Sequence, residues 1–255
     1  MTPLLLLVLT SWPSSSDGLK LLPLKPAADA RRAPKLRVYV DAGHGAKDNH
    51  GAVSALCENE EDFTARTADA LAKALAATGR FEVKLSRSGD ARPSYGARVA
   101  EAEKWRADVI LGIHFDVRGS AILWEPEPGK QCWRTPLLQA PGEETGGFSV
   151  LWSDEDQAKR PERQGGARLG RQISKSMAAA GFAPYGGWDY QGLYVPDEVP
   201  GCFIARRKVW MLKRPTIPSL IIETHHALDL QERARWDEPR TLQVFAAAIA
   251  AALLN

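Results

Sequence analysis

The stretch Val38–Gly45 constrains the fold of this chain more than any other. The β-branched and aromatic residues Val38–Val40 are typical of a buried strand, and they pass directly into a turn that carries Asp41 and His44 among glycines. Glycine permits positive φ and lets another group approach the backbone closely. In an α/β protein such a turn presents polar side chains at the carboxyl end of a strand. An isolated histidine here would simply be hydrogen-bonded to Asp41, so its interpretation depends on the other strands.

Two later apolar runs end in the same way. Val109–Ile113 is a continuous apolar run suited to a central parallel strand, and His114 follows it. Leu220–Ile222 is also apolar, and Glu223 follows it. Ligands of α/β proteins bind at the carboxyl ends of the strands, so we expect His44, His114 and Glu223 at one edge of the sheet.

Strand and helix patterns alternate along the rest of the chain. The periodicities predict strands at 38–40, 81–86, 109–113, 147–152 and 218–223, and helices at 58–79, 95–105, 166–180 and 242–254. Strands separated by helices predict one α/β domain over residues 36–255, with a mostly parallel central sheet and helices on both faces. Residues 118–146 and 181–209 are expected to be long loops, the first being an excursion that forms a hairpin or a lid over the site.

The amino-terminal region is expected to lie outside this domain. Residues 1–16 contain an apolar run too short to span a bilayer, similar to the core of a secretory signal peptide although basic residues do not precede it. Residues 17–35 mix Pro, Lys, Arg and Ala without a period, as a linker does. These features predict export to the periplasm, the cell wall or the extracellular space.

The net charge of +2 is nearly balanced, which argues against a nucleic-acid-binding surface. We expect a monomer without a stable membrane span.

The three cysteines, Cys57, Cys132 and Cys202, have no metal-binding spacing. One disulfide with a free thiol and three free thiols are both compatible with the sequence. If a disulfide forms, we expect the pair Cys132–Cys202, because both lie in Pro- and Gly-rich sequence.

The residue types at this sheet edge suit a catalytic zinc site. Glu60 lies at the start of the helix that follows the first strand. The first explanation for the acidic residues between 58 and 62 is that they stabilise the positive end of the helix dipole. A single cap needs only one side chain, so one of these acids is free to bind a metal. Two imidazoles and a carboxylate with an open fourth position form a recurring zinc arrangement, here His44, Glu60 and His114. Glu223 would then transfer protons, with its pKa raised by burial.

Several short motifs, in this order, resemble the zinc-dependent N-acetylmuramoyl-L-alanine amidases of the amidase-3 family. The similarity extends from residue 36 to the carboxyl terminus. It is carried by Asp41–Gly45, Glu60–Thr64, Leu85–Arg87 with Asp90 and Arg98, Ala107–Ile110 leading into His114, and Leu220–Glu223.

The resemblance implies that His44, Glu60 and His114 hold one Zn²⁺ ion and that Glu223 is the catalytic carboxylate. It implies hydrolysis of the amide between N-acetylmuramic acid and the L-alanine of the stem peptide, so peptidoglycan or muropeptides are the expected partners, with a protein activator as a further candidate.

Glu60 is selected within the acidic run because the family's ligand precedes the first apolar residue of its helix by three, here Phe63. Glu58 and Glu61 are the alternatives.

The sequence departs from the family at Ala46, at Phe115–Val117 and at His225–His226. The two histidines are candidates for substrate contacts, for support of the site or for an extra metal ligand, with a polar loop as the alternative. Further candidates for substrate binding or for support of the site are Asp41, Arg87 and Arg98.

Two other functions remain open at this point. A zinc carboxypeptidase or another amide hydrolase would use the same residues on a different bond. A catalytically inactive wall-binding module is disfavoured, because all four positions carry competent side chains.

Overall fold

The computed structural model describes residues 18–24, 34–136, 145–154 and 165–255. In chain order its elements are β1 (Leu36–Ala42), α1 (Glu60–Ala77), β2 (Phe81–Leu85), α2 (Tyr95–Lys104), β3 (Val109–Asp116), β4 (Ile122–Glu127), β5 (Lys130–Arg134), β6 (Ser149–Trp152), α3 (Gly165–Ala179), β7 (Tyr194–Pro196), β8 (Cys202–Ala205), α4 (Trp210–Lys213), β9 (Ser219–His226), α5 (Leu230–Arg235) and α6 (Pro239–Leu253).

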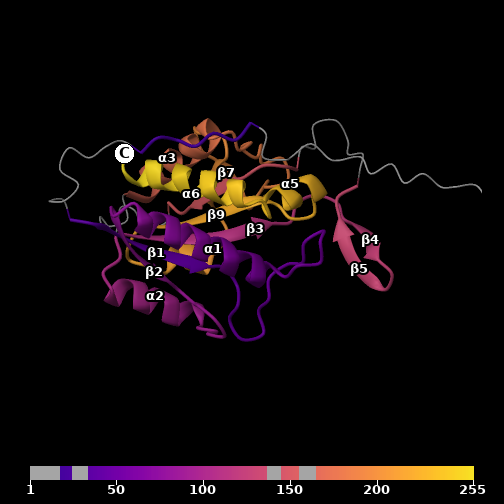
Figure 1. Cartoon of the computed structure of the whole chain (residues 1–255), viewed down its shortest axis with the longest axis horizontal. Helices are drawn as coiled ribbons and strands as arrows, with labels where there is room; N and C mark the ends of the chain where they lie inside the picture. The colour runs from indigo at the N-terminus through magenta and orange to yellow at the C-terminus, as the bar shows by residue number, and fades with distance from the viewer. Residues whose placement is uncertain (1–17, 25–33, 137–144, 155–164) are drawn as a thin grey trace, which may run out of the picture.

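A seven-stranded sheet forms the centre of the molecule, in the order β2-β1-β3-β9-β6-β8-β7. The pairs β1–β2, β1–β3, β3–β9 and β6–β8 are parallel, whereas β6–β9 and β7–β8 are antiparallel. Strands β4 and β5 form a separate antiparallel hairpin, which stands away from the sheet at one end of the molecule (Figure 1). The expected α/β domain with a mostly parallel sheet is therefore confirmed.

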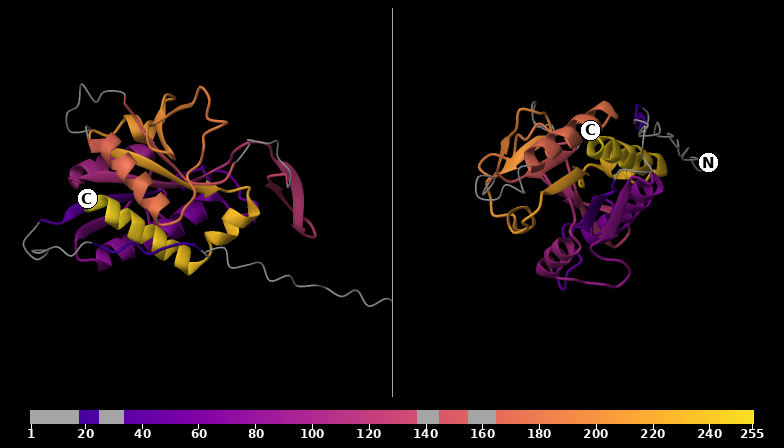
Figure 2. Two further views of the ribbon diagram at one scale, coloured as in Figure 1. Left: turned by 90° about the horizontal axis from the view of Figure 1, so that it is seen from above. Right: turned by 90° about the vertical axis from the view of Figure 1, so that its left-hand side faces the viewer.

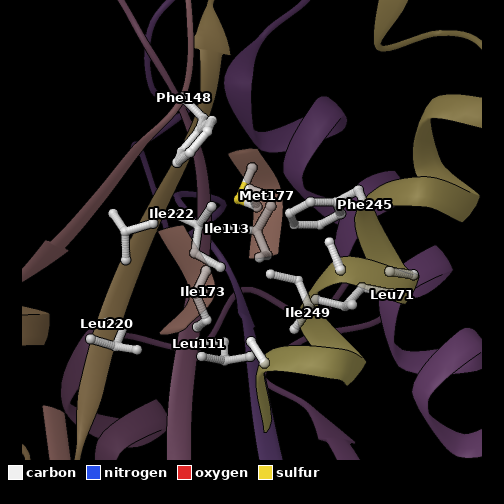
Figure 3. Packing of buried hydrophobic residues seen from close by; sticks show 14 of the residues in the cluster. Leu71, Leu111, Ile113, Phe148, Ile173, Met177, Leu220, Ile222, Phe245 and Ile249 are labelled. Atoms are coloured by element: carbon white, nitrogen blue, oxygen red, sulfur yellow. The ribbon is translucent and has the colours of Figure 1, made fainter. Parts of the chain in front are cut away.

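Helices cover both faces of the sheet, as Figures 1 and 2 show. One face packs against α1, α3 and α6 through residues such as Leu111, Ile222 and Ile249, and these side chains interdigitate in Figure 3. The other face packs against α2, α4 and the aromatic residues of 185–194, with Ile110 and Ile221 on the strand side. Strands buried on both faces explain the continuous apolar runs in the sequence.

Two expectations about secondary structure need correction. The stretch 181–209 is not only a loop, because it contributes β7 and β8 to the edge of the sheet. The last sheet strand, β9, does not end at Glu223 but continues to His226. In both cases pairing with a neighbouring strand stabilises an extended backbone where the local sequence has Pro, Gly or polar residues.

Part of the expected linker lies against the domain. Leu19 is buried, and the Lys20 amide donates to the carbonyl of Ala180 at 2.9 Å. The expected signal peptide, residues 1–16, lies outside the described residues. Within the described part of the chain, no helix combines the length and apolar character needed to cross a bilayer.

Candidate functional site

The turn after β1 holds His44 in a left-handed backbone conformation, with φ of 57°. This conformation is unfavourable for a residue with a side chain, so its surroundings must hold it. The guanidinium of Arg98 donates to the His44 carbonyl at 2.5 Å, and Asn49 Oδ1 lies 2.8 Å from His44 Nδ1. Backbone and ring are thus fixed separately.

Glu60, the first residue of α1, joins His44 to His114 at the end of β3. Its Oε2 lies 3.1 Å from His44 Nε2, and its Oε1 lies 2.9 Å from His114 Nδ1. Burial alone would raise the pKa of Glu60, but hydrogen bonds and charge from the two imidazoles outweigh it and lower this pKa to about 2. Glu60 is therefore an anion at neutral pH.

These three side chains fit a metal ion. One ligand atom from each lies within 4.8 Å of the others. The amide of Asn49 donates to the Tyr95 hydroxyl at 3.0 Å, which leaves Asn49 Oδ1 to accept from His44 Nδ1. In the neutral ring, His44 Nε2 then has a lone pair directed at an anionic carboxylate oxygen, and such a contact needs a proton or a metal ion between the two atoms. The N, N, O donor set is one that Zn²⁺ accepts.

The neighbouring acids have other partners. Glu58 contacts Arg66 and Arg233, and Glu61 contacts His50 and Arg92. Among the described residues, only Glu60 of this acidic run belongs to the cluster with both histidines.

Asp41 and Arg98 lie beneath the site as a fully buried ion pair, 3.0 Å apart. Arg98 also donates to the carbonyls of Ala42 and Pro93. Arg87 donates to the carbonyls of Ala42, Gly43 and Glu61. These three predicted residues therefore hold the backbone that carries His44 and Glu60 and do not join the cluster itself.

Glu223 lies beside His114 on the neighbouring strand. The two residues are Cα partners in the parallel pair β3–β9. Side chains alternate between the two faces of a strand, so His114 lies on the same face as Ile110, and Glu223 lies on the same face as Ile221. This is the face of the sheet that packs against the aromatic residues of 185–194. The buried Oε2 of Glu223 has no hydrogen-bond partner in the described part of the chain. Burial raises the pKa of Glu223 well above its usual range, and the charges of Asp116 and Glu60 add to the effect.

A polar group that the sequence did not predict borders Glu223. Ser149 is the partner of Glu223 in the antiparallel pair β6–β9, and its Oγ lies 3.2 Å from the hydroxyl of Tyr190. That hydroxyl also donates to Asp116, whose Oδ2 accepts from Arg118 Nε at 2.8 Å. Arg118 is completely buried and donates to the carbonyls of Thr145 and Gly147 as well. Apart from Asp116, its hydrogen-bond partners here are distant in sequence, so no local pattern indicated that Arg118 is buried.

His225 and His226 lie in β9, so the polar-loop alternative is wrong. Neither joins the metal-type cluster. His225 stacks on Trp236 at a centroid distance of 5.5 Å, among Phe63 and Phe115. The Nδ1 of His226 accepts from the amide of Arg118 at 3.2 Å, and its Nε2 lies 2.6 Å from Thr135 Oγ1. Both rings therefore support the core and the base of the hairpin.

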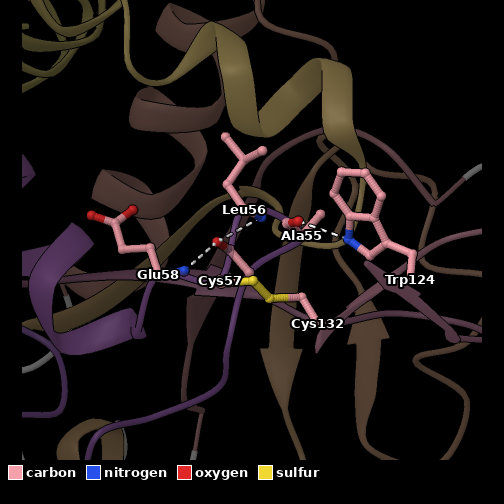
Figure 4. The surroundings of a disulfide bond; sticks show 7 residues. Ala55, Leu56, Cys57, Glu58, Trp124 and Cys132 are labelled. Carbon is pink, nitrogen blue, oxygen red and sulfur yellow. Dashed lines mark hydrogen bonds between the residues drawn. A yellow bond between two sulfur atoms is a disulfide. The ribbon is translucent and has the colours of Figure 1, made fainter. Parts of the chain in front are cut away.

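The expected disulfide Cys132–Cys202 is wrong. Cys57 and Cys132 form the disulfide, with Cα atoms 5.5 Å apart, and Cys202 is a buried free thiol. Cys202 belongs to β8 and packs against Gly170 of α3, so it is a core residue despite the Gly and Pro around it. The bridge ties the β4–β5 hairpin to the loop before Glu60, and Trp124 Nε1 adds a hydrogen bond to the Ala55 carbonyl at 2.9 Å (Figure 4).

Two residues near the cluster were missed. Asn49 has no periodicity to mark it, although a side-chain amide in a turn next to a histidine is a recognisable signal. Gly51 has φ of 76°, and a Cβ there would lie 2.6 Å from the Cβ of Glu60 and 2.8 Å from Cγ of His44. The position of Gly51 beside Glu60 and His44 depends on the folded chain, so no local sequence pattern indicates it.

Comparison with known proteins gives consistent results. A 92-residue part, 36% of the chain, is 33% identical to the N-acetylmuramoyl-L-alanine amidase AmiC of Escherichia coli O6:H1 (strain CFT073), and it spans only 22% of the length of that relative. Among solved structures, the amidase Ami1 of Mycobacterium abscessus matches with a TM-score of 0.65 and 19% identity, over 86% of this chain and 97% of that one. The catalytic domain of CwlV, an amidase from Bacillus (Paenibacillus) polymyxa var. colistinus, matches with a TM-score of 0.60 and 21% identity, over 86% and 96%.

At these identities the solved structures show a shared fold. The sequence itself matches the profile of the family described as Amidase_3, N-acetylmuramoyl-L-alanine amidase, over residues 38–255. This range contains the whole sheet apart from the first two residues of β1, together with His44, Glu60, His114 and Glu223. The chain therefore belongs to the Amidase_3 family of N-acetylmuramoyl-L-alanine amidases.

Proposed function

We propose that this protein is a zinc-dependent amidase that hydrolyses the bond between N-acetylmuramic acid and the L-alanine of the stem peptide in bacterial peptidoglycan. The observation that carries the proposal is the cluster of His44, Glu60 and His114 beside a carboxylate, Glu223, whose Oε2 has no partner among the described residues. Membership of the Amidase_3 family supports the substrate class.

In this proposal His44, Glu60 and His114 are the metal ligands. When bound, Zn²⁺ would supply a Lewis acid that polarises the scissile carbonyl and makes water a stronger acid. Asn49 orients the ring of His44 so that Nε2 offers its lone pair, and Arg98 keeps the backbone of the turn in place. Asp41 and Arg87 support the same turn from below.

Glu223 carries the proton. Its carboxylate accepts a proton from the attacking water as the water oxygen bonds to the lactyl carbonyl carbon, and it then donates that proton to the alanine nitrogen as the C–N bond breaks. The products are the free lactyl carboxylate and the free amine of the peptide. A raised pKa suits this work, because a carboxylate with a higher pKa is a stronger base toward the attacking water, and the amine nitrogen that leaves is basic enough to take the proton back from the carboxyl group.

The cellular setting is also part of the proposal. Peptidoglycan lies outside the cytoplasmic membrane, so export is required, and residues 1–16 as a signal peptide with 17–35 as a linker would provide it. The monomeric state and a protein activator stay predictions.

A digest of purified peptidoglycan, with and without a chelator, tests the proposal. We expect free stem peptides and intact glycan strands by mass analysis, lost with the chelator and restored by Zn²⁺. Peptides shortened within the stem would instead indicate a peptidase. No cleavage combined with no zinc by elemental analysis would indicate a wall-binding module, and would overturn the proposal.

A further inference from the structure

A row of aromatic and charged side chains extends from Glu223 across β6 to β8 and β7. We call this row, which comprises Tyr190, Tyr194 and Arg207, the wall. The rings of Tyr190 and Tyr194 lie 4.6 Å apart, and the Tyr190 hydroxyl reaches Asp116 and Ser149, next to Glu223. Tyr194 pairs with Ala205 in β7–β8, and the chain then runs through Arg206 and Arg207. This wall lies on the face of the sheet that bears His114 and Glu223.

Arg206 and Arg207 diverge at the end of β8. Both backbone amides donate to the carbonyl of Leu193, at 3.0 and 3.3 Å, which pins this segment to β7. The side chain of Arg206 forms an ion pair with Asp154 at 2.7 Å. Arg207 is instead exposed and interacts with the hydroxyl of Tyr194. Within the described residues, no carboxylate lies within ion-pair distance of Arg207.

The charges around the site make Arg207 distinctive. Glu60 lies between the two histidines and Asp116 is paired with Arg118, so both acids already have partners. Arg118 is buried and its donors are already used by Asp116 and by backbone carbonyls. Arg207 is exposed, and its positive charge opposes the rise in the pKa of Glu223.

The chemical structure of the expected substrate determines which of its parts carries a carboxylate. The lactyl carboxyl of the muramic acid is consumed in the scissile amide, and the rest of the sugar is neutral. Any carboxylate that approaches this wall with the substrate must therefore belong to the peptide, the part that leaves.

We propose that Arg207, together with the hydroxyl of Tyr194, binds a carboxylate of the stem peptide and so selects substrates that carry it. This inference rests on the proposed function. Arginine is suited to the task because its planar fork of donors matches a carboxylate, and the Tyr194 hydroxyl can donate to the same anion while it accepts from Arg207. Arg207 thereby positions the peptide and takes no part in proton transfer.

Two synthetic substrates test the proposal, N-acetylmuramoyl-L-alanyl-D-glutamate and the same compound with both glutamate carboxylates converted to carboxamides. With the zinc-loaded wild type, we expect a KM about tenfold lower for the carboxylate form and a similar kcat, as a charge-assisted hydrogen bond predicts. Arg207→Gln should abolish the preference and Arg207→Lys should keep part of it. Arg206→Gln is the matched control, because its partner is Asp154, and should leave the preference intact.

Binding of the product dipeptide gives a second readout that needs no turnover. By isothermal titration calorimetry, L-alanyl-D-glutamate should bind the wild type about tenfold more tightly than its diamide, and Arg207→Gln should remove the difference. A preference that survives in Arg207→Gln, or that is equally lost in Arg206→Gln, overturns the proposal. If the enzyme hydrolyses neither of the two substrates, the proposed function is contradicted. The calorimetric comparison would still decide the role of Arg207 in that case.

Discussion

His114 and Glu223 are Cα partners on adjacent parallel strands, and their side chains project from the same face of the sheet. Neighbouring strands lie about 4.8 Å apart, so the sheet itself sets the separation between a candidate metal ligand and the candidate proton carrier. Both strands are buried in the centre of the sheet and resist displacement. His44 and Glu60, by contrast, are held by a turn and by a helix terminus, and they need the additional contacts of Asn49 and Arg98.

Replacing Glu223 separates proton transfer from metal binding. Glu223→Gln should keep its zinc, because Glu223 does not belong to the three-residue cluster, and should lose about 10³-fold in kcat. His114→Ala should lose both zinc and activity. The measurements are release of stem peptides and elemental analysis of zinc. Glu82→Gln, an exposed acid on β2, serves as the control. Full activity in Glu223→Gln would contradict the assigned role.

Asn49 tests the orientation of His44. Asn49→Ala removes the acceptor for His44 Nδ1 while leaving the three ligand atoms in the chain. Loss of such an orienting hydrogen bond typically weakens metal binding by about 10- to 100-fold. Competition with a chromophoric zinc chelator measures the affinity directly. Unchanged affinity would mean that the ring is oriented by its backbone alone.

Gly43 tests how closely the turn approaches His114. A Cβ at this position would lie 2.3 Å from the His114 ring, so Gly43→Ala must displace either the ring or the turn. We expect weaker zinc binding, by about 10-fold or more, with the sheet preserved. Gly166→Ala in α3, where a Cβ meets none of the described residues within 4 Å, should leave the zinc affinity unchanged. Circular dichroism checks that both variants fold.

The disulfide predicts a stability difference between the cysteines. Cys57→Ser and Cys132→Ser should each lower the free energy of unfolding by about 2–4 kcal/mol, because the bridge closes a loop with a sequence separation of 75 residues. Urea denaturation measures the loss, and the double variant should lose no more than either single one. Peptide mapping without reduction should recover Cys57 joined to Cys132, and alkylation of the unfolded protein should label Cys202 alone.

Local sequence was sufficient for the features that depend on local pattern. The apolar runs Val109–Ile113 and Leu220–Ile222 predicted buried parallel strands, and the α/β class is confirmed. Those strand ends also predicted that His44 and His114 lie together, and the structure brings them into one cluster with Glu60.

The remaining features depend on contacts between distant segments. Cys202 stands in loop-like sequence but is buried by strand pairing, so composition suggested the wrong disulfide. Arg118 begins the stretch expected to be a loop excursion, and only the folded structure shows that its guanidinium is buried over the ring of Tyr185 at 4.0 Å. His225 and His226 continue a strand because β3 extends beside them as far as Asp116.

His226 gives the fold a defined dependence on pH. Burial lowers the pKa of His226 to about 4, and the charge of Arg118 acts in the same direction. The unfolded chain has a histidine pKa of about 6.5, so it takes up a proton first as the pH falls. Stability from this group is therefore complete above about pH 6.5 and is lost between about 6.5 and 4.

The variant His226→Gln isolates that contribution. Between pH 7.5 and pH 5 the wild type should lose about 2 kcal/mol more unfolding free energy than His226→Gln, since a 1.5-unit interval below the unfolded pKa corresponds to about that amount. Urea denaturation of the zinc-free proteins at the two pH values measures it. Other titrating groups, including His225 with its pKa lowered by burial, are common to both proteins and cancel in the comparison. Equal pH dependence in the two proteins would mean that His226 is protonated in the folded state, and that the hydrogen bond from the Arg118 amide to its Nδ1 does not hold the ring neutral.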